Sequence, residues 1–196
     1  AKNLKDPRAE AYALNQLGKL YTETQQWQEA EELTKQGLII AQGISAADMM
    51  ARSQAQLGEI LNHQGDVKGA IAAYTEAVNL LQSLRSDLVA INAEAQFSFR
   101  ESVEPIYRQL VGLLLKNNPS QENIKQARQV IEALQLAELD NFFREACLNA
   151  KPQQIDEIDP EAAVIYPIIL PDRLAVILSQ PGKSLTYYQT CLLYTS

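Results

Sequence analysis

The side chains of this 196-residue chain that could pair as base and nucleophile are its single histidine, His63, and its two cysteines, Cys147 and Cys191. Nucleophilic catalysis requires the histidine and the thiol to lie within hydrogen-bond reach of each other. His63 stands near the end of a predicted helix, where the helix dipole favours a histidine. Cys147 continues the apolar face of a later predicted helix, as a buried cysteine commonly does. We therefore predict structural roles for both and no catalytic residue.

A second motif, Gly182-Lys183-Ser184, has the residue types that end a phosphate-binding loop. The complete loop needs a glycine five positions before Gly182, where Ile177 stands, and a helix after the serine. A predicted strand follows the serine instead. These residues are therefore predicted to form a turn between two strands.

Charge and composition narrow the classes of partner. The net charge is −7 and the 17 Lys and Arg residues are scattered, which argues against nucleic acid. The neighbouring acidic residues Glu29, Glu31 and Glu32 have neither a partner acid for catalysis nor the spacing of metal ligands, so we expect no metal and no cofactor. No apolar run approaches the roughly 20 residues of a membrane span, and no signal peptide is visible. With two distant cysteines, the sequence favours a cytoplasmic protein without a membrane partner.

An internal repeat organises positions 1–86. Three features of a first copy recur in a second copy, each displaced by the same number of residues: Leu17-Gly18 recurs as Leu57-Gly58, Ala30 as Ala70, and Leu38 as Val78. Each copy is predicted to be one helical hairpin, in which the glycine and the alanine are small enough for the two helices to approach closely. The expected helices cover about 7–24, 27–42, 46–64 and 66–83.

Local signals support these boundaries. Asp6 before Pro7 has the sequence of an N-cap followed by proline at the first helical position. Ser45 with Asp48 resembles a capping box at the start of the third helix. Gly65-Asp66 is predicted to make the turn of the second hairpin.

The residues Leu57-Gly58, Leu61, Ala70 and Tyr74 resemble the pattern of the tetratricopeptide repeat (TPR) family. This resemblance implies an array that binds a protein or peptide on its concave face, and it leads us to expect further repeats before Ala1. The implied stripe contains Tyr12, Asn15, Lys19, Thr22, Arg52, Ala55, Glu59 and Asn62. A solvated helix face has the same appearance in sequence, and this alternative remains open.

Residues 87–150 are predicted to be long helices. The apolar spacing continues from Asp87 to about Lys116, and Pro105 is expected to break or kink this run. A loop at 117–120 precedes another helix from about Gln121. That helix is apolar on more than one face, so we expect it to be buried between two layers.

Residues 151–190 change to short apolar runs typical of strands, at 163–170, 174–178 and 185–188. Pro171-Asp172-Arg173 is predicted to be the turn of a hairpin. Because proline cannot donate to a ladder, Pro167 places the first strand at a sheet edge or a bulge. Such continuous apolar strands are typical of sheets covered on both faces.

The stretches 99–108, 130–139, 142–144 and 170–173 resemble, in order and composition, the opening of a CHAT domain. This is a caspase-like cysteine peptidase family found attached to TPR arrays in bacteria. The resemblance implies a mainly α chain that ends in the first strands of a caspase-like α/β domain. The family's histidine and cysteine follow later strands, so we expect this fragment to be inactive.

Two functions from different classes therefore stand side by side. The first is a regulatory TPR array fused to an incomplete cysteine peptidase domain. The alternative is a scaffold without enzymatic activity that binds a protein partner. Residues 191–196 do not continue the CHAT pattern, and we expect them to be a non-native tail.

Overall fold

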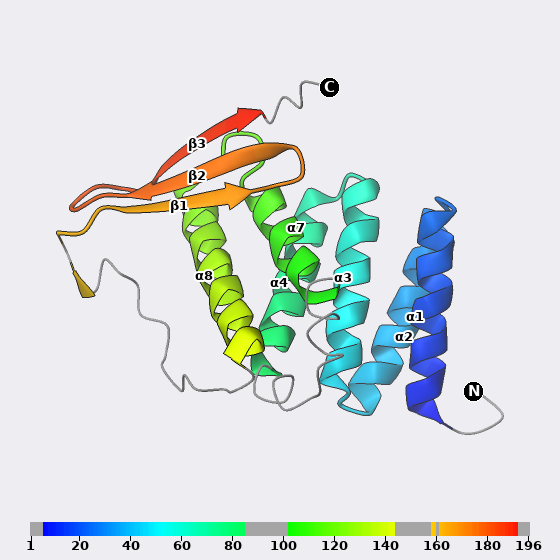
Figure 1. The fold of residues 1–196 in the computed structure, drawn as a ribbon. Coiled ribbons are helices and arrows are strands. Elements are labelled where there is room, and N and C mark those ends of the chain that lie inside the picture. Colours follow the sequence, from blue (N-terminus) through cyan, green and yellow to red (C-terminus); the bar gives the residue numbers. More distant parts are fainter. Residues whose placement is uncertain (1–5, 85–101, 144–157, 160, 192–196) are drawn as a thin grey trace. The chain divides into compact units, whose positions relative to one another are not determined.

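The computed structural model describes residues 6–84, 102–143, 158–159 and 161–191 (Figure 1). The described part of the chain contains six α-helices and one three-stranded sheet, which confirms the mainly α class. The chain divides into two compact units, residues 1–106 (unit 1) and 107–196 (unit 2). No helix among the described residues is long and apolar enough to cross a membrane.

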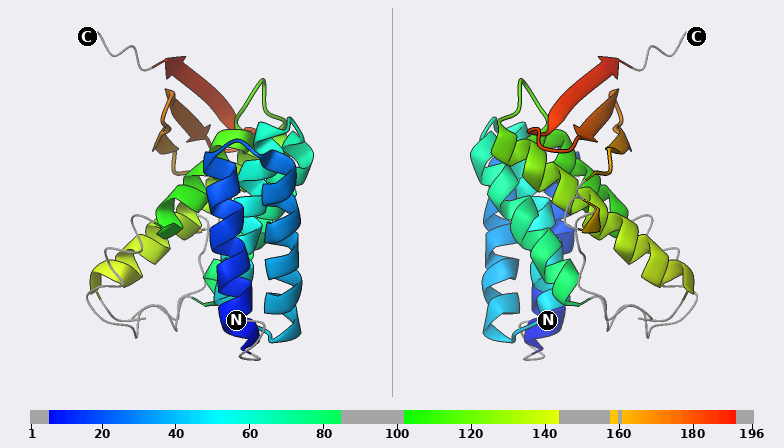
Figure 2. Two further views of the ribbon diagram at one scale, coloured as in Figure 1. Left: turned by 90° about the vertical axis from the view of Figure 1, so that its right-hand side faces the viewer. Right: turned by 90° about the vertical axis from the view of Figure 1, so that its left-hand side faces the viewer.

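Unit 1 contains four antiparallel helices of 17 residues, whose first residues are evenly spaced along the chain (Figures 1 and 2). These are α1 (Pro7–Glu23), α2 (Trp27–Gly43), α3 (Ala47–His63) and α4 (Val67–Ser83). The four predicted ranges are confirmed to within one residue at each end. α1 packs on α2, α2 on α3, and α3 on α4.

The three turns between these helices share one backbone geometry. The central residue of each turn has a positive φ: 59° at Gln25, 52° at Ser45 and 86° at Gly65. In each turn, the residue after the positive-φ residue donates its N–H to the carbonyl of the residue five positions earlier, at 2.8 to 2.9 Å. These bonds are the mark of the Schellman motif, which satisfies the last carbonyls of a helix.

Of the two N-terminal caps predicted from the sequence, one is present in the structure and the other is not. Asp6 caps α1 by accepting a hydrogen bond from the Ala9 N–H at 3.1 Å, as predicted. The capping box at Ser45 and Asp48 is wrong: the residue before α3 is Ala46, without a side-chain cap. Ser45 is already committed to the left-handed position of the turn, and Asp48 pairs instead with Arg8 of α1 at 2.5 Å.

The small residues of the repeat lie where the helices cross. Ala30 and Ala70 are completely buried. A Cβ added to Gly18 would lie 3.3 Å from the carbonyl oxygen of Ala30, so α1 and α2 meet at these two residues. The predicted close approach of the helices is thus confirmed in the first hairpin.

Equivalent positions on α1 and α3 differ in how far they are covered. Leu20 of α1 is 55% exposed, whereas Ile60, its repeat equivalent on α3, is 0% exposed. α3 packs on both α2 and α4, while the main helical neighbour of α1 among the described residues is α2. The inner helix therefore buries a face that α1 leaves open.

The described part of unit 2 contains α8 (Gln121–Phe143) and most of α7 (Glu104–Leu114), whose first three residues belong to unit 1. Pro105 is the second residue of α7, and the two residues before α7, 102 and 103, are π-helical, so the helical geometry changes where the break is predicted. The first half of the run predicted from Asp87 to Lys116 lies outside the described residues. The loop between the helices contains Asn117 and Asn118, both with positive φ.

The described side chains of α8 form a buried stripe at helical spacing. Its apolar members are Ile124, Ala127, Val130, Ile131, Leu134 and Ala137. Leu139, which belongs to the second apolar face in the sequence, is 46% exposed. Burial of α8 on more than one face is therefore not observed at this residue.

Three strands complete the described part of unit 2: β1 (Val164–Ile169), β2 (Arg173–Ser179) and β3 (Thr186–Cys191). They pair antiparallel in the order β1-β2-β3, with Pro167 opposite Val176. β1 is therefore an edge strand of the described sheet, as the proline predicts. The hairpin turn is closed by a hydrogen bond from the Leu170 N–H to the Arg173 carbonyl, at 2.9 Å.

One face of this sheet is buried and the other is open among the described residues. The buried side chains alternate along the strands: Tyr166, Ile168, Ala175, Ile177 and Ser179. On the opposite face Ile165, Ile169 and Tyr188 are 57 to 67% exposed. The expectation that both faces are covered is therefore not met in the described chain.

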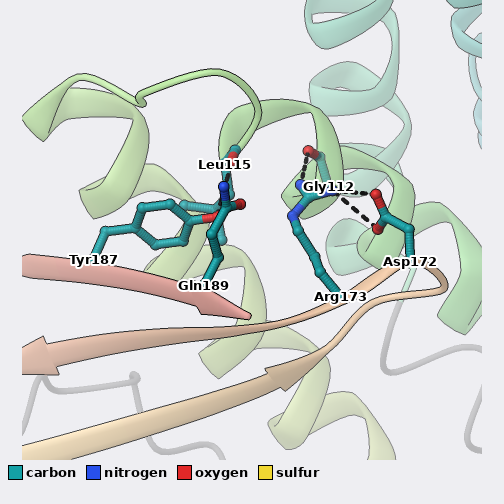
Figure 3. A network of polar contacts seen from close by, with 6 residues as sticks. All are labelled: Gly112, Leu115, Asp172, Arg173, Tyr187 and Gln189. Atoms are coloured by element: carbon teal, nitrogen blue, oxygen red, sulfur yellow. Dashed lines mark hydrogen bonds and ion pairs between the residues drawn. The ribbon is translucent and has the colours of Figure 1, made fainter. Parts of the chain in front are cut away.

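Hydrogen bonds to helical backbone hold the buried face of the sheet on α7 (Figure 3). Arg173 donates to the Gly112 carbonyl at 2.9 Å and pairs with Asp172 at 2.7 Å. The Tyr187 hydroxyl lies 3.0 Å from the Leu115 carbonyl oxygen and 2.8 Å from Oε1 of Gln189. β2 and β3 are thus each fixed to the C-terminal end of α7 by a polar side chain.

Candidate functional site

Four of the predicted partner-binding residues are exposed on the neighbouring helices α1 and α3, and are together named the α1–α3 face. They are Tyr12, Lys19, Arg52 and Glu59, all exposed. Because seven residues are close to two helical turns, Tyr12 and Lys19 share a face of α1, and Arg52 and Glu59 share the equivalent face of α3. None of these four side chains makes a hydrogen bond or ion pair with another described residue.

Asn15, also predicted for this stripe, lies inside the unit. It is 7% exposed, and its amide exchanges hydrogen bonds with the Ser53 hydroxyl of α3 at 2.8 and 3.0 Å. Thr22 is 8% exposed and donates to the Gly18 carbonyl. Asn15 and Thr22 are therefore structural, because their polar groups are already satisfied within the helices.

The remaining two residues of the stripe lie at its margin. Asn62 and Ala55 of α3 are both half-buried. Tyr12, Lys19, Arg52 and Glu59 are thus exposed on two neighbouring helices, while Asn15 is buried and is removed from the candidate site.

Asn15 belongs to a group of four polar side chains between α1, α2 and α3, here named the polar layer: Asn15, Thr34, Ser53 and Gln56. The Gln56 amide, oriented to satisfy both its ends, donates to the Asn15 carbonyl at 3.2 Å and accepts from the Lys19 N–H at 2.7 Å. In the same orientation it accepts from the Thr34 hydroxyl at 3.1 Å. Each member therefore has partners on a neighbouring helix or its own backbone.

Two glycines make the space for this layer. A Cβ added to Gly18 would lie 2.7 Å from both the side-chain amide of Gln56 and Thr34 Oγ1. A Cβ added to Gly37 would lie 2.6 Å from Asn15 Oδ1. Only a residue without a side chain fits at either point, so both glycines position polar atoms as well as helices.

The second hairpin fills the equivalent space with an aromatic ring. Tyr74, the repeat equivalent of Thr34, is 5% exposed. A Cβ added to Gly58, the equivalent of Gly18, would lie 2.6 to 2.9 Å from atoms of that ring. Burial, and secondarily the negative charge of Glu59, raise the pKa of the Tyr74 hydroxyl, so this side chain stays neutral.

A charged contact ties α2 to the end of α3. Glu31 accepts hydrogen bonds from Lys35 at 2.6 Å and from Gln64 at 2.8 Å. These two bonds, Lys35 first, hold the pKa of the Glu31 carboxyl below its usual value against an opposing effect of burial.

The residues considered for catalysis form no catalytic pair in the described chain. The His63 ring stacks on Trp27, with ring centroids 4.4 Å apart and an angle of 11° between the planes. Cys147 and the side chain of Cys191 lie outside the described residues. Within the described ranges no group of three His, Cys, Asp or Glu side chains could hold a metal ion.

The polar layer escapes sequence reasoning because its partners come from three helices. Asn15 falls in the predicted exposed stripe through its position in the repeat alone. One signal points to the layer: Gly37, a second glycine in the first hairpin, has Ala77 as its equivalent in the second. A glycine in the middle of a helix, found in only one copy, indicates that a neighbouring group in that copy needs its space.

In comparisons with protein-family models, curated proteins and solved structures, the chain matches none of them. The function is therefore inferred from the geometry of each unit and from the resemblances in the sequence.

Proposed function

We propose that unit 1 is a protein-binding helical repeat of TPR type that holds an extended polypeptide segment on the α1–α3 face. The observation that carries the proposal is the exposure of Tyr12, Lys19, Arg52 and Glu59 on two neighbouring helices. Tyrosine and arginine are enriched at protein interfaces, where an aromatic body and a planar cation give large contacts.

The chemistry of the face favours a peptide with mixed character. Tyr12, 54% exposed, offers a flat apolar surface with a hydroxyl at its edge. Lys19 and Arg52 suit carboxylates or backbone carbonyls of the peptide, and Glu59 suits a basic side chain or backbone N–H groups. A segment of polypeptide therefore fits better than a uniformly charged polymer.

The test is selection of short peptides from a random display library on the full chain, followed by calorimetry on the enriched sequences. We expect Tyr12→Ala and Arg52→Ala each to weaken binding at least tenfold. Lys116→Ala is the charge-matched control for Arg52→Ala, and Glu76→Ala is a second control, because both residues are exposed and lie off the face. Equal loss in the controls, or none in the face variants, would contradict the proposal.

For unit 2 we propose a relationship to CHAT-type cysteine peptidases, in which this unit contributes no catalytic group of its own. Support comes from hydrogen bonds that join the neighbourhoods of two stretches of that resemblance: Arg108 donates to the Ile169 carbonyl at 3.2 Å, and Arg173 donates to the Gly112 carbonyl of α7. The chain's single histidine is stacked on Trp27 in unit 1.

This part of the proposal is tested by incubating the full chain with a fluorogenic peptide library, with and without a thiol-alkylating reagent. We expect no turnover in either case. Turnover abolished by alkylation would overturn the assignment and direct attention to Cys147 and Cys191. A purely scaffolding protein remains the alternative, and it predicts the same α1–α3 face without any relation to peptidases.

A further inference from the structure

Unit 2 contains a cavity of about 440 Å³ at the start of α8. Its walls are the first two turns of α8 and the turn that joins β2 to β3. This volume lies within the range of about 300 to 1,000 Å³ that is usual for small-molecule sites. The cavity includes Gly182-Lys183-Ser184, the motif that is predicted from the sequence to form a turn.

The cavity carries more positive than negative charge. Lys125, Arg128 and Lys183 line it, and Glu122 is the one acidic residue of the lining among the described residues. Positive side chains therefore outnumber negative ones in the lining, in a chain whose net charge is −7. Neither lysine makes an ion pair with a described carboxylate, although Glu122 lies one turn before Lys125.

The three cations come from two elements that face each other. Lys125 and Arg128 are three residues apart on α8 and so share one side of the helix. Arg128 is 3% exposed, which fixes its guanidinium in the wall. Lys183 comes from the opposite turn, which Gly182 shapes with a φ of +66° and which a bond from the Lys183 N–H to the Gln180 carbonyl closes.

Neutral groups of the cavity add hydrogen-bond donors. Ser179, 5% exposed, and Ser184 bring hydroxyl groups to its lining. The first turn of α8 begins at the same place, with the Ser120 hydroxyl accepting from the Asn123 N–H at 3.1 Å. The positive end of the helix dipole therefore adds to the charge of the three cations.

We propose that this cavity binds the phosphate group of a small, polar phosphorylated molecule. A phosphate group has more acceptor oxygens than a carboxylate, so it can accept from the lysine and serine donors that line the cavity from both elements. Arginine and lysine are the side chains that bind phosphate most often, the first as a planar fork and the second as a point charge. The volume beyond the phosphate is lined by serine and glutamine side chains, which favour hydroxyl-bearing groups.

The proposal is tested by calorimetric titration of the full chain with inorganic phosphate at constant ionic strength. We expect saturable binding that weakens at least fivefold in Lys125→Gln and in Lys183→Gln. Both residues are exposed, so the unit should keep its fold. Lys116→Gln is the matched control, because Lys116 is an exposed lysine of the same unit outside the cavity lining.

A variant that introduces a negative charge, Ser184→Asp, is expected to abolish binding by placing a carboxylate in the cavity. Ribose 5-phosphate is expected to bind at least as tightly as inorganic phosphate. Absence of saturable binding, equal weakening in Lys116→Gln, or full affinity in Ser184→Asp would each overturn the site. Because the cavity belongs to unit 2, none of these outcomes bears on peptide binding by the α1–α3 face.

Discussion

The two hairpins of unit 1 have the same backbone and different interiors. The helices of the pair α1 and α2 are equal in length to those of the pair α3 and α4, and buried alanines stand at equivalent positions. Yet Gly18 makes room for Thr34 and Gln56, while Gly58 makes room for the ring of Tyr74. The repeat therefore keeps the spaces between helices and leaves their filling free to be polar or aromatic.

The two fillings stabilise by different means. The polar layer depends on every member keeping its hydrogen bonds, because an unpaired buried group costs about 1–3 kcal/mol. The aromatic filling depends on area removed from water and on contacts with the ring. Trp27, the chain's single tryptophan, lies in unit 1, so its fluorescence during urea unfolding measures the stability of this unit.

The largest expected effect is at position 74. Tyr74→Ala leaves a cavity the size of a ring and should lower the free energy of unfolding by about 3–5 kcal/mol. Thr34→Ala, the equivalent change in the first hairpin, should lower it by about 1–2 kcal/mol, since it removes one hydroxyl and one methyl group. Similar losses in urea unfolding at the two positions would refute the difference. Tyr12→Ala, at an exposed tyrosine, serves as the control, with a change below about 0.5 kcal/mol.

The glycines give the next effect. Gly58→Ala should destabilise by about 1–3 kcal/mol, because the new methyl group overlaps a buried ring that has little room to move. Gly43→Ala is the control: no atom lies within 4 Å of the added Cβ, so alanine should be neutral or slightly stabilising. In a Tyr74→Ala background, Gly58→Ala should lose most of its effect, as a double-mutant cycle would measure.

Asn15→Ala tests the polar layer. The change leaves the Ser53 hydroxyl without its cross-helix partner, and we expect a loss of about 1–2 kcal/mol in the free energy of unfolding. Peptide binding by the α1–α3 face, measured by calorimetry on the folded variant, should change less than twofold. A variant of full stability with weakened binding would return Asn15 to the binding surface.

Acid should affect the stability of the two hairpins differently, because Glu31 of the first hairpin has Ile71, which does not titrate, as its equivalent in the second. The folded-state pKa of Glu31 lies below its usual value near 4.5, so its contribution to stability is complete above that pH. This contribution is lost as the pH falls through the lower, folded-state pKa. Glu31→Gln should therefore flatten the fall in unfolding free energy between about pH 5 and about pH 3, whereas Glu76→Gln, on an exposed residue, should not.

The smallest effect is expected in the turns. Ser45 and Gln25 hold the left-handed position that Gly65 holds without strain. Ser45→Gly should therefore raise stability by about 0.5 kcal/mol, and Gly65→Ala should lower it by about 1 kcal/mol. Thermal unfolding of both variants checks the pair, and a destabilised Ser45→Gly would show that the serine side chain has a role in the turn.

The helices of unit 1 can be predicted because their signals are local. Apolar spacing, the Asp6 cap and the Gly65 turn all act within one helix or between neighbours. The hairpin of β1 and β2 is predictable for the same reason, since a short turn between apolar runs leaves antiparallel pairing as the simple outcome. Pro167 then identifies the edge strand.

The features that sequence reasoning misses depend on contacts between distant segments. The hydrogen bond between Asn15 and Ser53 joins residues 38 positions apart, and nothing local to Asn15 reveals it. The cavity of unit 2 gathers α8 and the turn after β2, although the motif around Lys183 is visible in the sequence. An apolar strand also looks the same in sequence whether one face or both are covered, so the open side of the sheet cannot be foreseen.

The uniform turns of unit 1 carry a consequence for how such a gene can change. The chain reverses direction after each helix, so a duplication or deletion of one whole hairpin restores the direction in which it leaves the array. Gain or loss of a single helix would invert that direction. Tandem duplication in steps of one hairpin would therefore lengthen the array and keep the direction in which the chain leaves it, while half-steps would reverse that direction.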